Sequence, residues 1–212
     1  MKKFLITLLL MFTLGCHRAP KAPEVKSPIE RQHASTHRIG VHSTLGALDD
    51  LSPTAHCSAT AVGPHALLTA QHCFMNSNTI KLDGSPTFNV KILAVMPDGN
   101  DHVIYIVNYT FQDFSPITQR SLLPGEKIHF WGNPGHLKDT YRDGTFTGMH
   151  YEPDLDFNFQ TFLLPTYGGD SGSALFDKDG KIVAVVSLGA TREPGEMSLP
   201  LQFTKGQLKA VQ

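Results

Sequence analysis

A serine and a histidine stand out in this sequence because each lies in a short segment whose composition suits nucleophilic catalysis. Ser171 lies in the glycine-rich run Gly168-Gly169-Asp170-Ser171-Gly172, and His72 directly precedes Cys73. A serine hydroxyl is a weak nucleophile at neutral pH and needs an adjacent base. A histidine can be that base, since its ordinary pKa lies close to neutral. The two side chains could transfer an acyl group if the fold brings them together.

The elements that would have to position these residues are mostly short strands. Runs rich in β-branched and aromatic residues alternate with turn signals, such as those at 63–65 and 177–180. No long stretch before residue 205 has helical periodicity, while 207–212 is expected to form a short helix. Many short strands with frequent turns predict an all-β barrel or sandwich. The predicted strands are 56–62, 66–70, 87–96, 103–110, 127–131, 141–151, 156–164, 174–176 and 182–187.

The first residues have the pattern of an export signal. Two lysines precede an apolar run, 4–14, which is too short to span a bilayer stably but suits the core of a signal peptide. The run ends in Gly15-Cys16, which resembles a bacterial lipobox, although Thr13 stands where Leu is favoured. We expect 1–15 to be a signal peptide and Cys16 to carry a lipid anchor; ordinary secretion is the alternative. Both place the mature protein outside the cytoplasm, in a bacterial cell envelope or secreted.

The cysteine count fits the lipid anchor. Three cysteines are an odd number for an exported protein. If Cys16 carries lipid, Cys57 and Cys73 remain as one pair, and a disulfide closing a loop of this size would stabilise the fold by about 3 kcal/mol. Residues 16–36 are rich in Pro, Lys and Ser, which predicts a flexible tether. The compact part is expected from residue 37, with 111–124 linking two halves, 37–118 and 119–212.

The charge balance excludes one class of partner. The formal net charge is −1 and only 17% of the residues are charged, so no basic field exists to bind nucleic acid. Eleven histidines raise the question of a metal, and His33, His37 and His42 near the tether are the candidates. No histidine pair has the spacing of a helical zinc motif, so we interpret them as solvated and expect no metal or other cofactor. The protein is expected to be a monomer.

Two segments carry a resemblance to a known family. The segment 57–73 is similar to the trypsin-family segment in which strand, turn and strand lead to Thr-Ala-Ala-His-Cys, and only Gln71 departs from that pentamer. The segment 168–176, with the strand after it, resembles the family's Gly-Asp-Ser-Gly-Gly-Pro segment. Ser173 and Ala174 replace Gly-Pro, as in many bacterial relatives. The sequence thus resembles the trypsin/chymotrypsin family of serine proteases in a compact bacterial form.

The resemblance implies a fold, a reaction and a site. The fold would be two packed antiparallel β-barrels, with His72 and Ser171 meeting at the cleft between them and the short helix at the C-terminus. The reaction would be hydrolysis of peptide bonds in a protein or peptide substrate. The backbone N–H groups of Gly169 and Ser171 would point at the developing oxyanion, where losing one such donor typically costs about 3 kcal/mol.

The base also needs a carboxylate that fixes its tautomer. In this family the order along the chain is His, Asp, Ser, and the Asp directly precedes an apolar strand. Asp101 precedes the run 102–106 and is the favoured candidate, although His102 departs from the usual small or apolar residue. Asp98 is the second candidate, but turn chemistry explains an Asp in Pro97-Asp98-Gly99.

The same resemblance assigns a substrate pocket. Pro165 stands where an Asp would select Arg or Lys, so cleavage after basic residues is not expected. Val186 stands where glutamate-specific relatives have a His. Ser187 aligns with a Ser that supports the catalytic Asp by a hydrogen bond. We expect a small or apolar residue before the scissile bond. The pocket set is Pro165, Thr166, Val186, Ser187 and Gly189.

Two alternatives remain open. In zymogens of this family, cleavage before an Ile-Val-Gly-Gly frees an amine that pairs with the Asp preceding the catalytic Ser. Arg38-Ile39-Gly40-Val41 matches that motif loosely, and the simpler interpretation is an arginine at a first strand.

The chain could also be a non-catalytic protease homologue that binds a partner, although no triad residue is missing. An α/β-hydrolase is excluded, because it needs Gly-x-Ser-x-Gly and the order Ser, Asp, His.

Overall fold

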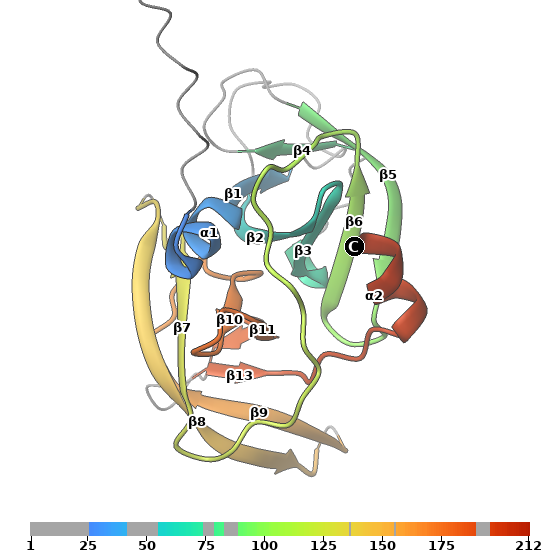
Figure 1. Ribbon diagram of the computed structural model, residues 1–212. Helices are drawn as coiled ribbons and strands as arrows, with labels where there is room; N and C mark the ends of the chain where they lie inside the picture. The colour runs from blue at the N-terminus through green and yellow to red at the C-terminus, as the bar shows by residue number, and fades with distance from the viewer. Residues whose placement is uncertain are drawn as a thin grey trace, which may run out of the picture.

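The computed structural model describes residues 26–41, 55–73, 79–82, 89–135, 137–154, 156–189 and 196–212. Within them the chain forms two β-sheets and two short α-helices (Figure 1). The predicted chymotrypsin-like double-barrel class is confirmed: one sheet is a closed barrel and the other is curled into a half-barrel. The helices described are too short to cross a membrane.

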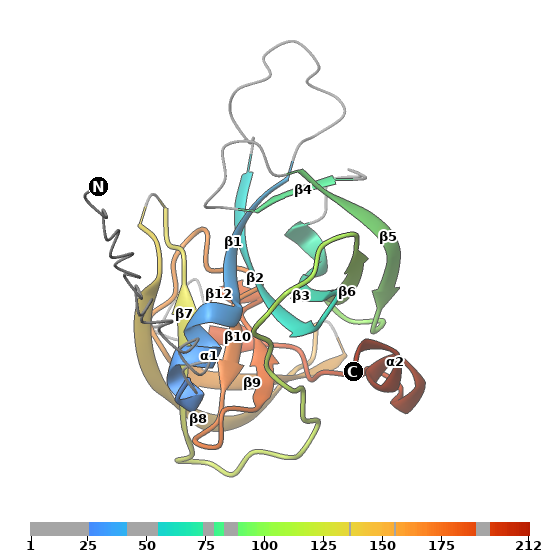
Figure 2. The same ribbon diagram turned by 45° about the horizontal axis from the view of Figure 1, so that its top comes forward.

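The first six strands close into a barrel in the order β1-β2-β3-β6-β5-β4 (Figure 2). All neighbours are antiparallel, and β1 pairs with both β2 and β4 to complete the circle. Every residue of β3 is buried, as expected for a continuous apolar run in a barrel core. The strands are β1 (Thr36–Val41), β2 (Ala55–Gly63), β3 (Ala66–Ala70), β4 (Thr79–Leu82), β5 (Asn89–Pro97) and β6 (His102–Val107).

The remaining strands form a seven-stranded sheet in the order β11-β10-β7-β8-β9-β13-β12. Its long hairpin β8–β9 curves strongly (Figure 1), and its inner face encloses a separate cluster that includes Phe130, Phe146 and Phe162. The strands are β7 (Lys127–Gly132), β8 (Thr140–Glu152), β9 (Phe157–Leu163), β10 (Ala174–Phe176), β11 (Ile182–Val185), β12 (Leu188–Gly189) and β13 (Glu196–Ser198). The segment 111–124 runs between the sheets, where Ile117 forms a single bridge with Ile182.

The C-terminal helix is confirmed, with slightly different bounds. Helix α2 (Lys205–Val211) begins at a capping box in which Thr204 and Gln207 exchange side-chain and backbone hydrogen bonds. It lies against the first barrel (Figure 1), where the Gln207 side-chain amide donates to the backbone carbonyl of Pro97 at 2.9 Å.

The prediction of a flexible tether over 16–36 is wrong for its last part. Pro28–Ser35 form helix α1, and β1 begins at Thr36. Ser27 and Glu30 make a capping box and Pro28 occupies the first turn, so the sequence did carry a helix-start signal that the Pro- and Ser-rich composition obscured. Residues 1–25, with Cys16, and His42 lie outside the described residues.

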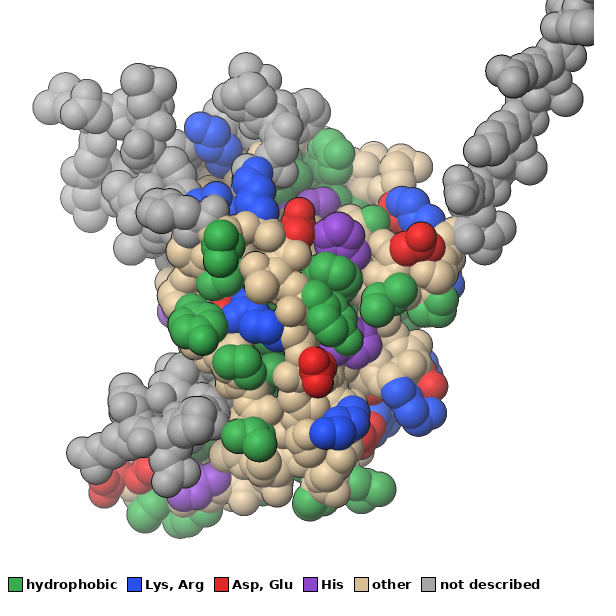
Figure 3. Space-filling view, turned by 90° about the vertical axis from the view of Figure 1, so that its left-hand side faces the viewer, with side chains coloured by type: hydrophobic (Ala, Val, Ile, Leu, Met, Phe, Trp, Pro, Cys, Tyr) green, Lys and Arg blue, Asp and Glu red, His purple; other side chains and the backbone are tan. Residues whose placement is uncertain are grey.

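Helix α1 packs on the second sheet. The Gln32 side-chain oxygen lies 2.6 Å from the Nε2 of His129 in β7. The His33 ring packs against Trp131 of the same strand, with centroids 4.2 Å apart and the ring planes tilted by 32°. Figure 3 shows this face, with histidines lying among apolar side chains over α1, β7 and β8. The helix therefore connects the start of the first barrel to the second half.

We expect the stability of the fold to depend on pH through His37 in β1. Its ring packs against Phe111, with centroids 5.1 Å apart, and burial lowers its pKa from 6.5 to about 4. Between pH 4 and pH 6.5 the His37 side chain is protonated in the unfolded chain but not in the folded chain. The free energy of unfolding should therefore fall as pH decreases from 6.5 to 4, by up to about 3 kcal/mol.

Urea unfolding of wild type and His37→Gln at pH 7 and at pH 4.5 measures this contribution. The variant should lose less stability than wild type on acidification, whereas His150→Gln, at a 54% exposed side chain, should behave like wild type. An equal loss in all three proteins would contradict the assignment.

Candidate active site

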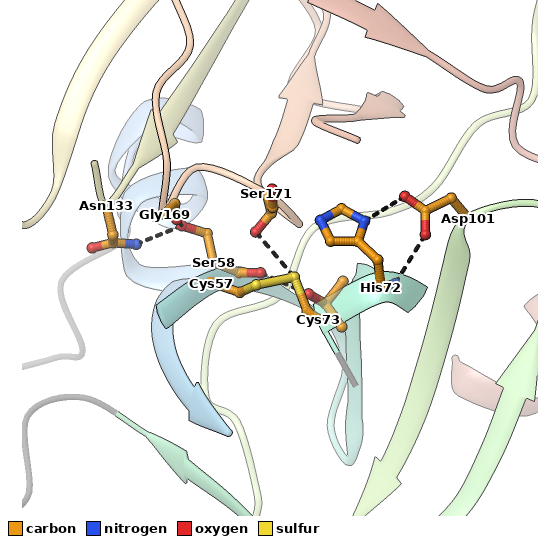
Figure 4. The surroundings of a disulfide bond; sticks show 9 residues. Cys57, Ser58, His72, Cys73, Asp101, Asn133, Gly169 and Ser171 are labelled. Carbon is orange, nitrogen blue, oxygen red and sulfur yellow. Dashed lines mark hydrogen bonds and ion pairs between the residues drawn. A yellow bond between two sulfur atoms is a disulfide. The ribbon is translucent and has the colours of Figure 1, made fainter. Parts of the chain in front are cut away.

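His72 is held by the end of the β2–β3 hairpin. It lies in the short 3₁₀ turn Gln71–Cys73 that follows β3. The predicted disulfide is present: Cys73 is bonded to Cys57 in β2, with Cα atoms 6.2 Å apart. The bond fixes the turn that carries His72 to the neighbouring strand (Figure 4).

Removing this disulfide is expected to lower the free energy of unfolding by about 3 kcal/mol, because the unfolded chain regains the freedom of the closed loop. Thermal or urea unfolding of the variant Cys57→Ala/Cys73→Ala measures the loss. A reducing agent should destabilise wild type by a similar amount and leave the double variant unchanged. A wild type whose stability does not change on reduction would contradict this contribution of the disulfide.

Asp101 holds the His72 ring. The Nδ1 of His72 donates to the Oδ2 of Asp101 at 2.7 Å, and the His72 backbone N–H donates to Oδ1 at 2.9 Å. The backbone N–H of Gln71 also donates to the Asp101 carbonyl, at 2.8 Å. Burial by itself raises the pKa of Asp101, but the hydrogen bonds and charge of His72 outweigh it and lower that pKa overall. An ionised carboxylate thus fixes the ring with Nδ1 protonated.

Asp98 is hydrogen-bonded to His102 and not to His72. Its Oδ2 accepts from the Nδ1 of His102 at 2.8 Å, and both side chains are completely buried. Of the two candidates for the orienting acid, the structure brings Asp101 to His72. Sequence reasoning missed the Asp98–His102 pair, since the turn alone accounts for an Asp at position 98.

Ser171 lies on the other side of the His72 ring from Asp101 (Figure 4). Its backbone carbonyl accepts from the N–H of Ser58 at 2.7 Å, which ties the loop to β2 of the first barrel. The hydroxyl of Ser58 donates to the carbonyl of Gly169 at 3.0 Å and accepts from the Nδ2 of Asn133 at 3.0 Å. Ser58 and Asn133 were not found from the sequence, because no local pattern shows that they meet.

The loop before Ser171 presents two unused backbone donors. In the part of the chain that the structure describes, the N–H groups of Gly169 and Ser171 donate to no other backbone group. Gly169 has φ of +102°, and a Cβ there would lie 2.4 Å from the carbonyl oxygen of Asn133. Only glycine fits this position, and the resulting turn leaves both donors available to a bound anion.

A buried ion pair lies beneath this loop. The Arg142 guanidinium of β8 donates to both carboxylate oxygens of Asp170, at 2.7 and 2.5 Å. The side chains are 11% and 0% exposed. The Asp170 carboxylate also accepts from the backbone N–H of Tyr167 at 2.8 Å. Gly132 makes room for the pair, because a Cβ there would lie 2.3 Å from the carboxylate. Sequence reasoning missed Arg142, which is one of several charged residues along a strand.

The residues predicted for the substrate pocket lie on both sides of Ser171 in the sequence. Pro165 is exposed and its carbonyl accepts from Arg142 at 3.1 Å, while Thr166 is half-buried. Val186 is 3% exposed and belongs to the core of the second half. Ser187 is buried, and Gly189 pairs with Glu196 in the sheet. Their role in substrate binding stays a prediction.

A cavity of about 600 Å³ opens beside His72 and Asp101. Phe157 and Phe159 of β9 together with Leu199 form an apolar wall of this cavity. The two aromatic rings contact each other, with centroids 5.5 Å apart. The cavity offers a largely apolar surface next to the His72 ring.

The described residues contain no group of three or more His, Cys, Asp or Glu side chains placed to hold a metal ion. Of the histidines considered from the sequence, His33 packs against Trp131 and His37 packs against Phe111.

Comparisons with known proteins identify the family of the chain. The model of the family described as trypsin-like peptidase domain matches residues 57–185, more than half of the chain. Among solved structures, the chain is similar to the inactive form of the Rv3671c protease, with 19% identity and a TM-score of 0.66 over 87% of this chain and 92% of that one. It is also similar to the active form from M. tuberculosis, with 17% identity and a TM-score of 0.66 over 87% and 82%. No curated protein matches the chain. The chain belongs to the trypsin-like peptidase domain family.

Proposed function

We propose that the protein is a serine endopeptidase that uses Ser171, His72 and Asp101. The observation that carries the proposal is the hydrogen bond from His72 Nδ1 to Asp101 at 2.7 Å, with Ser171 on the opposite side of the ring (Figure 4). In the neutral ring this hydrogen bond places the proton on Nδ1, so that Nε2, on the side of Ser171, can accept one.

The residues then have distinct roles in one reaction. The Ser171 Oγ attacks the carbonyl carbon of the scissile bond while His72 takes its proton. The N–H groups of Gly169 and Ser171 stabilise the oxyanion. His72 returns the proton to the leaving amine, and an acyl-enzyme remains. Water, deprotonated by His72, then releases the acid. Asp101 stays ionised throughout and stabilises the imidazolium.

We propose further that the uncut chain is active. Ile39 is 1% exposed and pairs with Cys57 and Leu82 inside the barrel, so cleavage before it would break β1. Arg142 already supplies Asp170 with a cation, the task that a freed amine would perform. An activity that appears only after cleavage between Arg38 and Ile39 would refute this part of the proposal.

A fluorophosphonate probe tests the proposed function. The folded wild type should be labelled at Ser171, as identified by mass spectrometry of the labelled peptide, without prior cleavage. A folded sample that takes up no label would favour the alternative, a non-catalytic homologue that binds its partner without hydrolysing it.

The substrate preference is proposed to be apolar. Pro165 places no charge in the predicted pocket, and Phe157, Phe159 and Leu199 line the cavity beside His72. We expect a peptide library to show cleavage after small or apolar residues, with a second apolar side chain preferred close to the scissile bond. Predominant cleavage after Arg or Lys would contradict the role given to Pro165.

The aromatic wall gives this preference a direct test. Phe157→Ala is expected to lower kcat/KM for the preferred peptide about 10- to 100-fold, because the cavity loses one of the three apolar side chains of this wall. The same change should have little effect on a peptide with a small polar residue at that place. Tyr151→Ala, at an exposed aromatic of β8, is the control and should change neither substrate. Equal losses for both peptides would point to a defect in the catalytic residues instead.

We also propose that the protein is exported, acts as a monomer, and is anchored to a membrane through lipid on Cys16. The export signal in the sequence supports this, and the Cys57–Cys73 disulfide suits a compartment outside the cytoplasm. Metabolic labelling with an alkyne fatty acid tests the anchor: wild type should incorporate the label and Cys16→Ala should not. Incorporation by the variant would place the lipid elsewhere.

A further inference from the structure

A buried chain of polar side chains lies directly beside the His72–Asp101 pair. His102 Nδ1 contacts Asp98 at 2.8 Å, and its Nε2 lies 3.4 Å from the Oγ of Ser187. The Asp98 and His102 side chains have no exposed surface, and Ser187 is 6% exposed. This second Asp–His–Ser chain is therefore closed to a peptide, and its function must be exerted through its neighbours.

The Asp98 carboxylate is built to stay ionised inside the protein. Besides His102, it accepts from the backbone N–H groups of Asn100 at 2.9 Å and Gln202 at 3.0 Å. Burial by itself raises the pKa of Asp98, but these hydrogen bonds, with that from His102 the largest, lower it overall. A buried charge with this many donors is held in one position.

The network joins the turn that carries Asp101 to the second half of the molecule. Asp101 lies between Asn100 and His102 in the sequence, and the side chains of both neighbours contact residues that follow position 180. The Asn100 side chain donates to the carbonyl of Pro200 at 2.7 Å, and His102 contacts Ser187. The residues on both sides of Asp101 are thus in contact with the second half, which also carries the Ser171 loop.

Stability alone does not account for such a pair. Replacing a buried polar pair by apolar side chains of similar size is often neutral or stabilising, since the polar groups must be desolvated. Catalysis makes a stricter demand, because a misplacement of about 1 Å in a catalytic group can cost about 100-fold in rate. The Asp101 carboxylate must keep both of its hydrogen bonds to His72.

We propose that Asp98 and His102, with His102 lying against Ser187, are positioning residues that hold Asp101, and through it His72, in register with Ser171 across the boundary between the two halves. The inference rests on the proposed function. Neither Asp98 nor His102 is a catalytic residue in it, because each acts through Asp101.

Two substitutions of His102 separate positioning from simple packing. The amide of an asparagine lies near the Nδ1 position of the ring and can keep the bond to Asp98, whereas that of a glutamine lies nearer Nε2 and loses it. His102→Gln is expected to lower kcat about 10- to 100-fold with KM changed less than about twofold, and His102→Asn to lose less. Phosphonylation of Ser171 should slow in parallel.

The dependence of kcat/KM on pH distinguishes positioning from packing, because a packing defect alone would not shift its acid limb. A displaced Asp101 stabilises the imidazolium of His72 less, so the acid limb of kcat/KM should move to lower pH in His102→Gln. His150→Gln, in the exposed His150–Glu152 pair, is the control and should leave the profile unchanged. If the His102 variants do not fold, Asp98→Asn, which keeps the volume, should show the same slower labelling and shifted limb.

The outcomes are distinguishable. Folded His102 and Asp98 variants with a lower melting temperature but unchanged kcat and acid limb would show that the pair is only structural. A folded wild type that the fluorophosphonate does not label would instead overturn the proposed function, and the positioning role with it.

Discussion

We expect the Ser171→Ala variant to lose almost all peptide hydrolysis, with kcat lowered by about 10⁶, the loss typical when a triad nucleophile or base is removed. The variant keeps the Asp101–His72 hydrogen bond and the two unused donors of the loop. What remains is the slow reaction that oxyanion stabilisation alone supports. His72→Ala should cost a similar factor, and the double variant little more, because the two residues act as one unit.

Ser173→Ala is the matched control, since it makes the same change in the same loop. The Ser173 hydroxyl is buried and has no hydrogen-bond partner among the described residues. Its removal should leave kcat unchanged and stability equal or slightly higher, because an unsatisfied buried hydroxyl is lost. Activity is measured with a fluorogenic peptide at matched protein concentration. Substantial activity in Ser171→Ala, after removal of contaminating proteases, would show that another group is the nucleophile.

The second large effect concerns Arg142. Arg142→Met is expected to lower the free energy of unfolding by about 3–5 kcal/mol, because Asp170 would remain buried without its cation. Asp170 lies between the two residues whose N–H groups form the proposed oxyanion site, so kcat should fall as well. Urea unfolding and peptide hydrolysis on the same samples measure the two losses.

Companion variants separate charge from geometry. Adding Asp170→Asn to Arg142→Met removes the unpaired charge and should recover much of the stability. Arg142→Lys keeps the charge but not the two parallel hydrogen bonds, so its free energy of unfolding should lie between those of wild type and Arg142→Met. Lys178→Met, which breaks an exposed pair with Asp179, should change stability by less than about 1 kcal/mol. A loss for Arg142→Met no larger than this would mean that the buried pair is not needed.

The parts of the fold that could be predicted from sequence have local signals. The strand, turn and strand leading to His72 and the glycine-rich run around Ser171 are continuous segments, and the disulfide follows from a cysteine count. The short terminal helix has a capping box. Asp101 required the family's pattern as well, because its place directly before an apolar strand indicates a catalytic role only through that resemblance.

What could not be predicted depends on residues that meet only in the folded chain. Arg142 and Asp170 are 28 positions apart, and alternation along a strand does not say which arginine turns inward. Asp98 has a sufficient local explanation in its turn, which hid its buried partner His102. Helix α1 is different: Ser27 and Glu30 are a local signal for its start, but the composition around them is typical of a flexible segment.

Each of the two terminal helices of the domain contacts the half that is farther from it in the sequence. Helix α1 precedes the first barrel yet contacts β7 of the second half through Gln32 and His129, and helix α2 follows the second half yet contacts Pro97 of the first barrel. Neither half can open from the other without releasing both ends. The heat of unfolding should therefore be absorbed in a single transition, with equal calorimetric and van't Hoff enthalpies, although the chain has two hydrophobic cores.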